Sequence, residues 1–240
     1  MQSDNIPRKL ARKVAIWSRI VLRSFRGILL YPRYRDFTMV PPFTFARNLA
    51  LCAIGAPASG CIVECGVWRG GMSAGMADIL PGRLHLLFDS FEGLPPATDA
   101  DGAYAISWQK NTSAENYYDN CRAERGYAER AMQMSAAKRF KLVQGWFRDT
   151  LAAFKPEEPI AILRLDADWY ESTMQCLTAL YPHVVPGGLI IIDDYYGWDG
   201  CSRAVHDFLS RTQSPERIET WGNVCFITKG SPRTLGPPVP

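Results

Sequence analysis

The segment VECGVWRGGMS, residues 63–73, indicates how this chain folds. It joins an apolar run to a helical pattern beginning near Met72, through glycines at 66, 70 and 71 that let the backbone approach a ligand closely. The free N–H groups at the start of such a helix suit an anion such as a carboxylate. Glu64 and the wide glycine spacing differ from the G-x-G-x-x-G of pyrophosphate binders, and a carboxylate there attracts an ammonium or sulfonium group instead. The alternative is that the glycines form only a tight turn.

Strand-like apolar runs and helical patterns alternate along the rest of the chain. We expect strands at Cys61–Val67, Leu84–Phe91, Phe140–Trp146, Ile160–Asp166, Gly188–Asp194 and Val224–Thr228, with a weaker one near Arg217–Thr220. The helical patterns lie at Met72–Leu80, Ala114–Ala137, Arg148–Ala153, Ser172–Val185 and Ser202–Arg211. This alternation predicts an α/β fold with a doubly wound, mostly parallel sheet, in which ligands bind at the carboxyl ends of the strands.

The composition is that of a globular protein with one large domain. Of 240 residues, 47% are hydrophobic and 21% charged, which excludes a disordered chain, a collagen-like repeat and a small disulfide scaffold. No apolar stretch approaches the roughly 20 residues that span a bilayer. The seven cysteines form no CxxC pair and the three histidines are scattered, so we expect buried reduced thiols in a cytoplasmic protein and no zinc centre.

The N-terminal arm is strongly basic, whereas the body is mildly acidic. Residues 1–35 hold nine Lys or Arg and one acid, and a helical stripe of apolar residues opposes the arginines between Pro7 and Leu30. The favoured interpretation is a helix that packs on the body or on a second subunit, so we expect a homo-oligomer. The alternative is peripheral contact of residues 8–30 with anionic lipid at the inner membrane surface. The acidic body and the absence of a known motif argue against a nucleic-acid partner.

Two strand ends carry residues that suit a nucleoside. Asp89 follows the glycine turn by about 20 residues, a spacing typical of an acid that binds a ribose diol. Its alternative role is to cap the following turn. At the end of the third strand, Trp146 or Phe147 could stack on an adenine that Gly145 lets approach, or the aromatic rings could be part of the core.

Acidic residues end the fourth and fifth strands. If these strands are neighbours, Asp166, Asp193 and Asp194 meet at one edge of the sheet, where three carboxylates repel one another unless a cation lies among them. Ligands that are all oxygen favour Mg²⁺ or Mn²⁺, which would lower the pKa of a substrate hydroxyl. Asp166 is then a candidate for both ligand and catalytic base. Alternatively, one aspartate caps a helix and another pairs with Arg164 or Arg203.

These motifs together resemble the macrocin O-methyltransferase (TylF/MycF-like) family of class I S-adenosylmethionine-dependent enzymes. The resemblance covers roughly residues 37–230 and is carried by FTMV at 37–40, VECGVWRGG at 63–71, FDSFEGLP at 88–95, QGWF at 144–147, LDADWYEST at 165–173 and IDDY at 192–195. It implies a seven-stranded sheet, S-adenosylmethionine as cofactor, Mg²⁺ held by Asp166, Asp193 and Asp194, and a sugar hydroxyl as acceptor. It also implies a cofactor site lined by Glu64, Gly66, Gly70, Ser73, Asp89, Ser90, Gly145 and Trp146, with Thr38 and Met39 in its lid. Ala167 departs from the family's usual glycine.

The resemblance divides the chain into a basic arm at 1–36, a methyltransferase domain at 37–230 and a loose tail at 231–240. We expect the acceptor pocket to come from loops at 37–45 and 96–120. Three other functions stay open: methylation of a catechol-like or phenolic hydroxyl, a catalytically silent membrane-associated binding protein, and a nicotinamide dehydrogenase. The missing G-x-G-x-x-G argues against the dehydrogenase, and the intact acidic residues argue against the silent protein.

Overall fold

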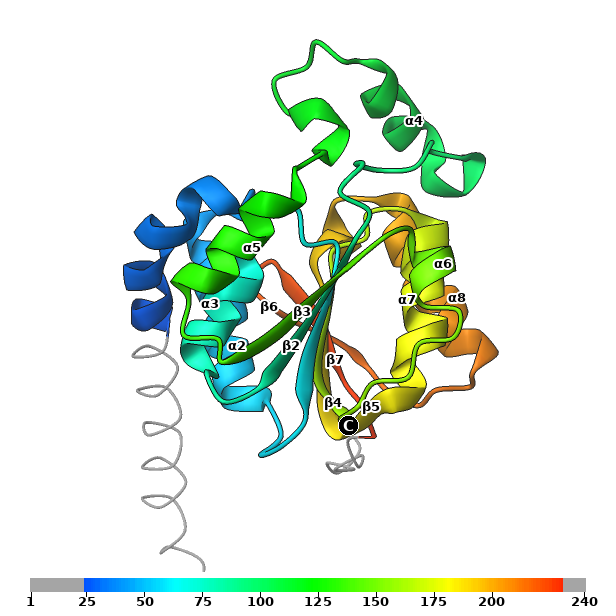
Figure 1. Ribbon diagram of the computed structural model, residues 1–240. Coiled ribbons are helices and arrows are strands. Elements are labelled where there is room, and N and C mark those ends of the chain that lie inside the picture. Colours follow the sequence, from blue (N-terminus) through cyan, green and yellow to red (C-terminus); the bar gives the residue numbers. More distant parts are fainter. Residues whose placement is uncertain (1–23, 231–240) are drawn as a thin grey trace, which may run out of the picture.

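A single seven-stranded sheet forms the centre of the computed structural model, which describes residues 24–230 (Figure 1). The strand order is β3-β2-β1-β4-β5-β7-β6; β1 to β5 are parallel to one another, and β7 is antiparallel to both β5 and β6. The strands are β1 Cys61–Cys65, β2 Leu84–Asp89, β3 Arg139–Gln144, β4 Ile160–Leu165, β5 Val184–Ile192, β6 Ile218–Trp221 and β7 Val224–Thr228. The doubly wound, mostly parallel sheet predicted from the sequence is confirmed.

Helices cover both faces of the sheet (Figure 1). On one face lie the helical residues 24–34 with α2 Pro42–Gly55, α3 Gly71–Ile79 and α5 Arg125–Met134. On the other lie α6 Phe147–Thr150, α7 Tyr170–Leu180 and α8 Asp199–Arg211. Helix α4, Gly102–Lys110, stands apart above the carboxyl ends of the strands.

Strand alternation builds two hydrophobic cores from one sheet. Ile162 and Leu163 are adjacent in β4 and both fully buried, yet Ile162 belongs to the core under α2 and α3 and Leu163 to the core under α7 and α8. Successive side chains of a strand point to opposite faces, so a strand covered on both faces must be apolar throughout. That explains the continuous apolar runs of β4 and β5.

Two helices, α2 and α4, were not predicted from the sequence. Helix α2 begins inside a segment expected to be a loop, and it is buried around much of its circumference, so it has no polar stripe to reveal a helical period. Helix α4 lies within the predicted loop at 96–120. The helix expected at 114–137 is shorter: α5 begins at Arg125, after a turn at Tyr118–Cys121 whose residues all have positive φ angles.

The end of the predicted arm packs against the body. Tyr34 is fully buried and donates a hydrogen bond of 2.7 Å to Asp78 on α3, while Arg26 donates to the Asp78 carbonyl at 3.0 Å. The domain boundary expected at residue 36 therefore falls inside a packed unit. Phe25 and Leu29 of the apolar pattern are 58% and 64% exposed. Residues 1–23 and the tail at 231–240 lie outside the described residues, so oligomer formation or lipid contact through the arm stays a prediction.

Within residues 24–230, no individual helix has both the length and the apolar character needed to cross a membrane. Two consecutive helices, Ser24–Phe37 and Pro42–Gly55, reach the required length and apolar character only when taken together, and they are bent by 119° where they meet. All seven cysteines are free and six of them are buried, as expected.

Candidate functional site

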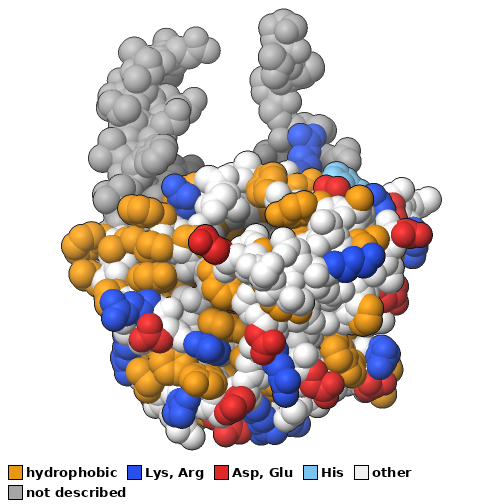
Figure 2. All heavy atoms as spheres, turned by 90° about the horizontal axis from the view of Figure 1, so that it is seen from above, with side chains coloured by type: hydrophobic (Ala, Val, Ile, Leu, Met, Phe, Trp, Pro, Cys, Tyr) orange, Lys and Arg blue, Asp and Glu red, His pale blue; other side chains and the backbone are white. Residues whose placement is uncertain are grey.

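A cavity of about 320 Å³ opens at the carboxyl ends of β1 to β4, below α4. Figure 2 shows this end of the molecule, where hydrophobic and charged side chains are interspersed. Seven residues predicted for the site line the cavity: Met39, Gly66, Asp89, Ser90, Gly145, Trp146 and Asp166. The cavity thus lies where a doubly wound sheet is expected to bind its ligand.

The glycine turn brings the end of β1 against the loop that follows β4. Gly66 has a φ of +82°, and a Cβ atom at this position would lie 1.6 Å from the carbonyl oxygen of Asp166, so only glycine fits. Gly70, also at +82°, allows a close approach to Ala128 on α5 and does not line the cavity. The turn therefore fixes the backbone at Asp166 beside the cavity.

Asp89 holds the same turn together. Its Oδ2 accepts hydrogen bonds from the backbone N–H groups of Val67 at 2.7 Å and Trp68 at 2.8 Å, and its Oδ1 accepts one from Phe91 at 2.7 Å. Burial raises the pKa of Asp89, and these bonds act against the rise. The alternative role considered for Asp89, a cap for the turn, is what its contacts show, although it also lines the cavity.

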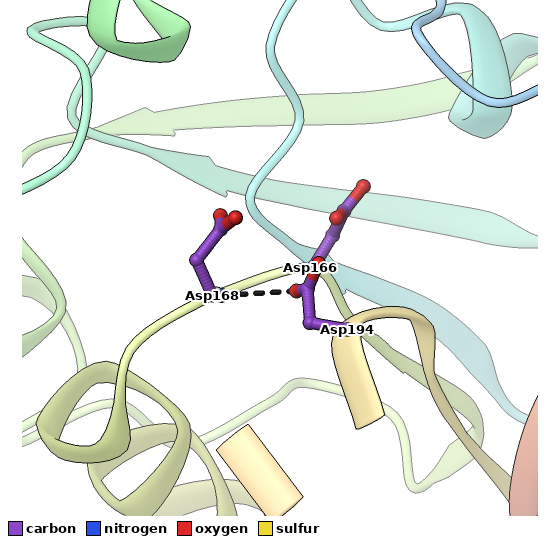
Figure 3. A group of neighbouring side chains, drawn as sticks. All are labelled: Asp166, Asp168 and Asp194. Atoms are coloured by element: carbon purple, nitrogen blue, oxygen red, sulfur yellow. Dashed lines mark hydrogen bonds between the residues drawn. The ribbon is translucent and has the colours of Figure 1, made fainter. Parts of the chain in front are cut away.

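Three aspartates form an acidic group at the ends of β4 and β5 (Figure 3). One carboxylate oxygen each from Asp166, Asp168 and Asp194 lies within 4.8 Å of the others, and the Asp168 N–H donates to Asp194 Oδ2 at 2.9 Å. Burial raises the pKa of Asp168 to about 7 and those of Asp166 and Asp194 well above their ordinary value. Asp168 has a φ of +55°, an uncommon conformation often found at functional sites.

The group holds Asp166 and Asp194 of the predicted ligand set and Asp168 in place of Asp193, and the ligand set itself stays a prediction. The Oδ1 atom of Asp193 lies 2.5 Å from Nη2 of Arg164, an ion-pair contact on the α3 side of the sheet. Asp193 and Asp194 both follow β5, in the short helix Asp193–Tyr196, where the first contacts Arg164 and the second accepts the hydrogen bond from Asp168. Asp168, two residues after Asp166, is the third member of the acidic group.

Arg164 lies behind the wall of the cavity, in contact with three carboxylates. Its Nη1 is 2.6 Å from Glu64 Oε1 and 2.7 Å from Asp166 Oδ2. Ser73 donates a further hydrogen bond to Glu64. Glu64 and Ser73 were expected to line the cofactor site; both are buried by these contacts and neither lines the cavity.

The acidic group has the composition of a site for a hard divalent cation. Among the ion pairs of the described residues, Arg164 reaches Asp166 but neither Asp168 nor Asp194. Arg164 therefore offsets the charge of only one of the three side chains, and their donors are all carboxylate oxygens, which Mg²⁺ and Mn²⁺ prefer. The residues present fit such an ion.

The comparison with known families agrees with this geometry. Residues 50–227 match the model of the family described as macrocin-O-methyltransferase (TylF). The chain belongs to this family. It is therefore a methyltransferase of the class that uses S-adenosylmethionine, as the sequence resemblance implied.

Curated relatives of this macrocin O-methyltransferase family member are O-methyltransferases, and the name of one of them includes a rhamnosyl group. An 8-demethyl-8-(2,3-dimethoxy-alpha-L-rhamnosyl)-tetracenomycin-C 4'-O-methyltransferase of Streptomyces olivaceus is 36% identical over 203 residues, covering 79% of this chain and 76% of the relative. A mycinamicin III 3''-O-methyltransferase of Micromonospora griseorubida is 34% identical, covering 69% and 67%. The solved O-methyltransferase NovP is 26% identical over 75% of each chain, with a TM-score of 0.59. The calicheamicin methyltransferase CalS11, 20% identical over 86% of this chain and 93% of its own, shares the fold with a TM-score of 0.58.

Several residues of the methyltransferase cavity were missed from the sequence. Asp168 stands in the quoted segment LDADWYEST, and its Asp-x-Asp spacing was the signal that could have found it. Trp68, Leu94, Pro95 and Trp169 also line the cavity. These apolar residues carry no pattern that separates a cavity wall from a core.

An aromatic cluster joins the acidic group of the methyltransferase to α4. The rings of Trp169 and Trp198, which follow Asp168 and Asp194 in sequence, are 4.9 Å apart, and Trp108 of α4 packs on both at 6.1 and 5.4 Å. Trp169 also donates a hydrogen bond of 2.9 Å to the carbonyl of Pro95 at the base of the α4 segment. The cover of the cavity is thus attached to the loops that hold the acidic residues.

Proposed function

We propose that this methyltransferase transfers a methyl group from S-adenosylmethionine to a sugar hydroxyl of a glycosylated small molecule, with Mg²⁺ or Mn²⁺ held by Asp166, Asp168 and Asp194. The observation that carries the proposal is the position of the acidic group: Asp166 and Asp168 line the same cavity as the glycine turn and Asp89. The sugar acceptor is supported by the rhamnosyl group in the name of the Streptomyces olivaceus relative.

The acidic residues would have two roles, binding the divalent ion and accepting the proton of the acceptor hydroxyl. When bound, a divalent ion supplies a positive charge that lowers the pKa of the acceptor hydroxyl. Asp166, predicted to be both ligand and base, has one oxygen engaged by Arg164. Asp168 also lines the cavity and has no ion pair among the described residues, so we assign the proton to Asp168.

The remaining cavity residues would position the two substrates. Gly66, Ser90, Met39 and Trp146 all line the same cavity, and we assign them to the methyl donor. The cover formed by Pro95 and α4 would exclude water and hold the acceptor hydroxyl in line with the methyl group. Positioning of this kind contributes a large share of the catalysis of group transfer.

The test is methyl transfer by the purified protein with S-adenosylmethionine and Mg²⁺. Acceptors are deoxysugar glycosides, their aglycones and a simple catechol, and mass spectrometry locates the new methyl group. We expect a product only with the glycosides, methylated on the sugar, and loss of turnover with EDTA that Mg²⁺ or Mn²⁺ restores. Methylation of the catechol alone would replace the sugar acceptor with the phenolic alternative, and full turnover in EDTA would refute the metal.

Two variants test the assigned residues. Asp166→Asn and Asp168→Asn should each reduce turnover by at least about 100-fold, because general base catalysis and charge stabilisation each contribute a factor of that order. Affinity for S-adenosylmethionine, measured by calorimetry, should stay close to that of the unchanged protein. Near-normal turnover of Asp168→Asn would show that the proton goes elsewhere.

A further inference from the structure

Arg164 is the most completely enclosed charge in the described part of the chain. Its side chain is 0% exposed, and its guanidinium group lies among the carboxylates of Glu64, Asp166 and Asp193. No residue of this set is close to Arg164 by sequence except Asp166. The contacts are therefore made by the fold and not by a local turn.

The sheet places these four side chains on one face. Glu64 of β1 and Arg164 of β4 are register partners on neighbouring strands. Asp166 follows Arg164 by two residues, and Asp193 follows Ile191, the register partner of Arg164 on β5, by two residues. Since alternate residues of a strand share a face, one arginine is surrounded by acids from three adjacent strands.

Stability alone does not account for this arrangement. Removing charges from water is costly, and buried ion pairs are often replaced by apolar side chains without loss of stability. The neighbouring positions on the same face, Ile162 and Ile191, are apolar and fully buried, so an apolar residue would suit position 164. A charged residue here therefore indicates a requirement of the site.

We propose that Arg164 is a positioning residue for Asp166. Its Nη1 atom holds the Oδ2 atom of Asp166 and also contacts Glu64, while Asp193 contacts its Nη2 atom, so three carboxylates fix the guanidinium. A guanidinium can hold several carboxylates at once in fixed geometry, whereas an ammonium cannot. The inference rests on the proposed function, because it gives Asp166 its orientation toward the proposed ion.

The first test is Arg164→Lys, which keeps the charge and removes the fork of donors. Residues behind metal ligands typically contribute about 10–100-fold to metal affinity or activity. We expect Mn²⁺ to bind at least about 10-fold more weakly, measured from the electron paramagnetic resonance signal of the free ion without substrates. We also expect kcat to fall by at least about 10-fold, with KM for S-adenosylmethionine within about 3-fold of normal.

A second variant keeps the proposal open to refutation if Arg164→Lys destabilises the fold. The double variant Arg164→Met with Glu64→Gln removes one charge of each sign, and Glu64→Gln alone reports any direct effect of Glu64 on cofactor binding. We expect the double variant to show the same losses of Mn²⁺ affinity and kcat as Arg164→Lys. Near-normal Mn²⁺ affinity and kcat in the folded double variant would overturn the proposal.

The matched control is a buried polar pair away from the cavity. Tyr34→Phe with Asp78→Asn disrupts the hydrogen bond between the arm and α3, and neither residue lines the cavity. We expect a lower Tm with unchanged Mn²⁺ affinity; equal losses of Mn²⁺ affinity in the control and in Arg164→Lys would assign the effect to general destabilisation and overturn the proposal.

Failure of the proposed function gives a different result. If the unchanged protein binds no Mn²⁺ and turns over fully in EDTA, the metal is refuted. The role of Arg164 is then decided by kinetics alone: a fall in kcat with normal KM for S-adenosylmethionine supports positioning of Asp166, and an unchanged kcat overturns it.

Discussion

Asp193 and Asp194 are adjacent in the short helix that follows β5, but their carboxylates contact different residues. The carboxylate of Asp193 contacts Arg164 at 2.5 Å, whereas Asp194 accepts a hydrogen bond of 2.9 Å from the N–H group of Asp168. Two equal-looking acids at the end of β5 therefore have different partners. One neutralises a buried cation and the other belongs to the acidic group.

This difference predicts that the two aspartates respond differently to the same substitution. Asp194→Asn should weaken Mn²⁺ binding by at least about 10-fold, because it removes a proposed ligand. Asp193→Asn should weaken Mn²⁺ binding by less than about 10-fold, so its affinity should stay well above that of Asp194→Asn. Calorimetric titration of Mn²⁺ measures both. Equal losses for the two variants would return Asp193 to the ligand set.

Asp89 is expected to matter for stability as well as for cofactor binding. Asp89→Ala leaves three backbone N–H groups without their acceptor, and we expect it to lower the free energy of unfolding by about 2 kcal/mol or more. Urea denaturation measures the loss. Asp89→Asn keeps one acceptor oxygen and should lose less, and exposed Glu157→Ala is the control, expected to change stability by less than about 0.5 kcal/mol. Normal stability of Asp89→Ala would contradict the capping role.

His85 is expected to make stability fall in acid. It is buried in β2, and burial lowers its pKa to about 4, compared with about 6.5 in an unfolded chain. Between these values the unfolded chain binds more protons, so the free energy of unfolding decreases as the pH falls through this window. Between pH 7.5 and pH 5, His85 should lower the free energy of unfolding by about 2 kcal/mol. Denaturation at both pH values should show a shallower decrease for His85→Leu; parallel decreases for the two proteins would be inconsistent with a buried neutral histidine.

The aromatic cluster is expected to affect the acceptor more than the donor. Trp169→Phe keeps a ring against Trp198 and removes the hydrogen bond to Pro95, a change worth about 1 kcal/mol. We expect KM for the acceptor to rise by about 5-fold while KM for S-adenosylmethionine changes less. Steady-state kinetics with each substrate varied in turn measures the two constants. A larger change in KM for S-adenosylmethionine than in KM for the acceptor would place α4 over the part of the cavity assigned to the methyl donor.

The sheet could be predicted from the sequence because its strands are apolar runs ended by polar residues. Ile160–Leu165 and Leu189–Ile192 are unmistakable as central strands, and the resemblance to the family implied that the sheet has seven strands. Helix α2 could not be recognised, because a helix buried on most sides shows no amphipathic period.

The site was predictable to the level of its strand ends but not of its side-chain contacts. The sequence placed Asp166 and Asp194 at the right edge of the sheet. It could not separate Asp193 from Asp194, because that depends on which residue of the short helix after β5 contacts Arg164. It also could not show that Glu64 is held by Arg164, since the two are 100 positions apart and meet only through the pairing of β1 with β4.

The contact between Glu64 and Arg164 also constrains how this sequence can diverge. An unpaired charge at either position would be left in the interior, so a single substitution is strongly disfavoured while a paired replacement can be tolerated. Among homologous genes, codons 64 and 164 are therefore expected to change jointly, and lineages that have lost the arginine should have lost the glutamate as well.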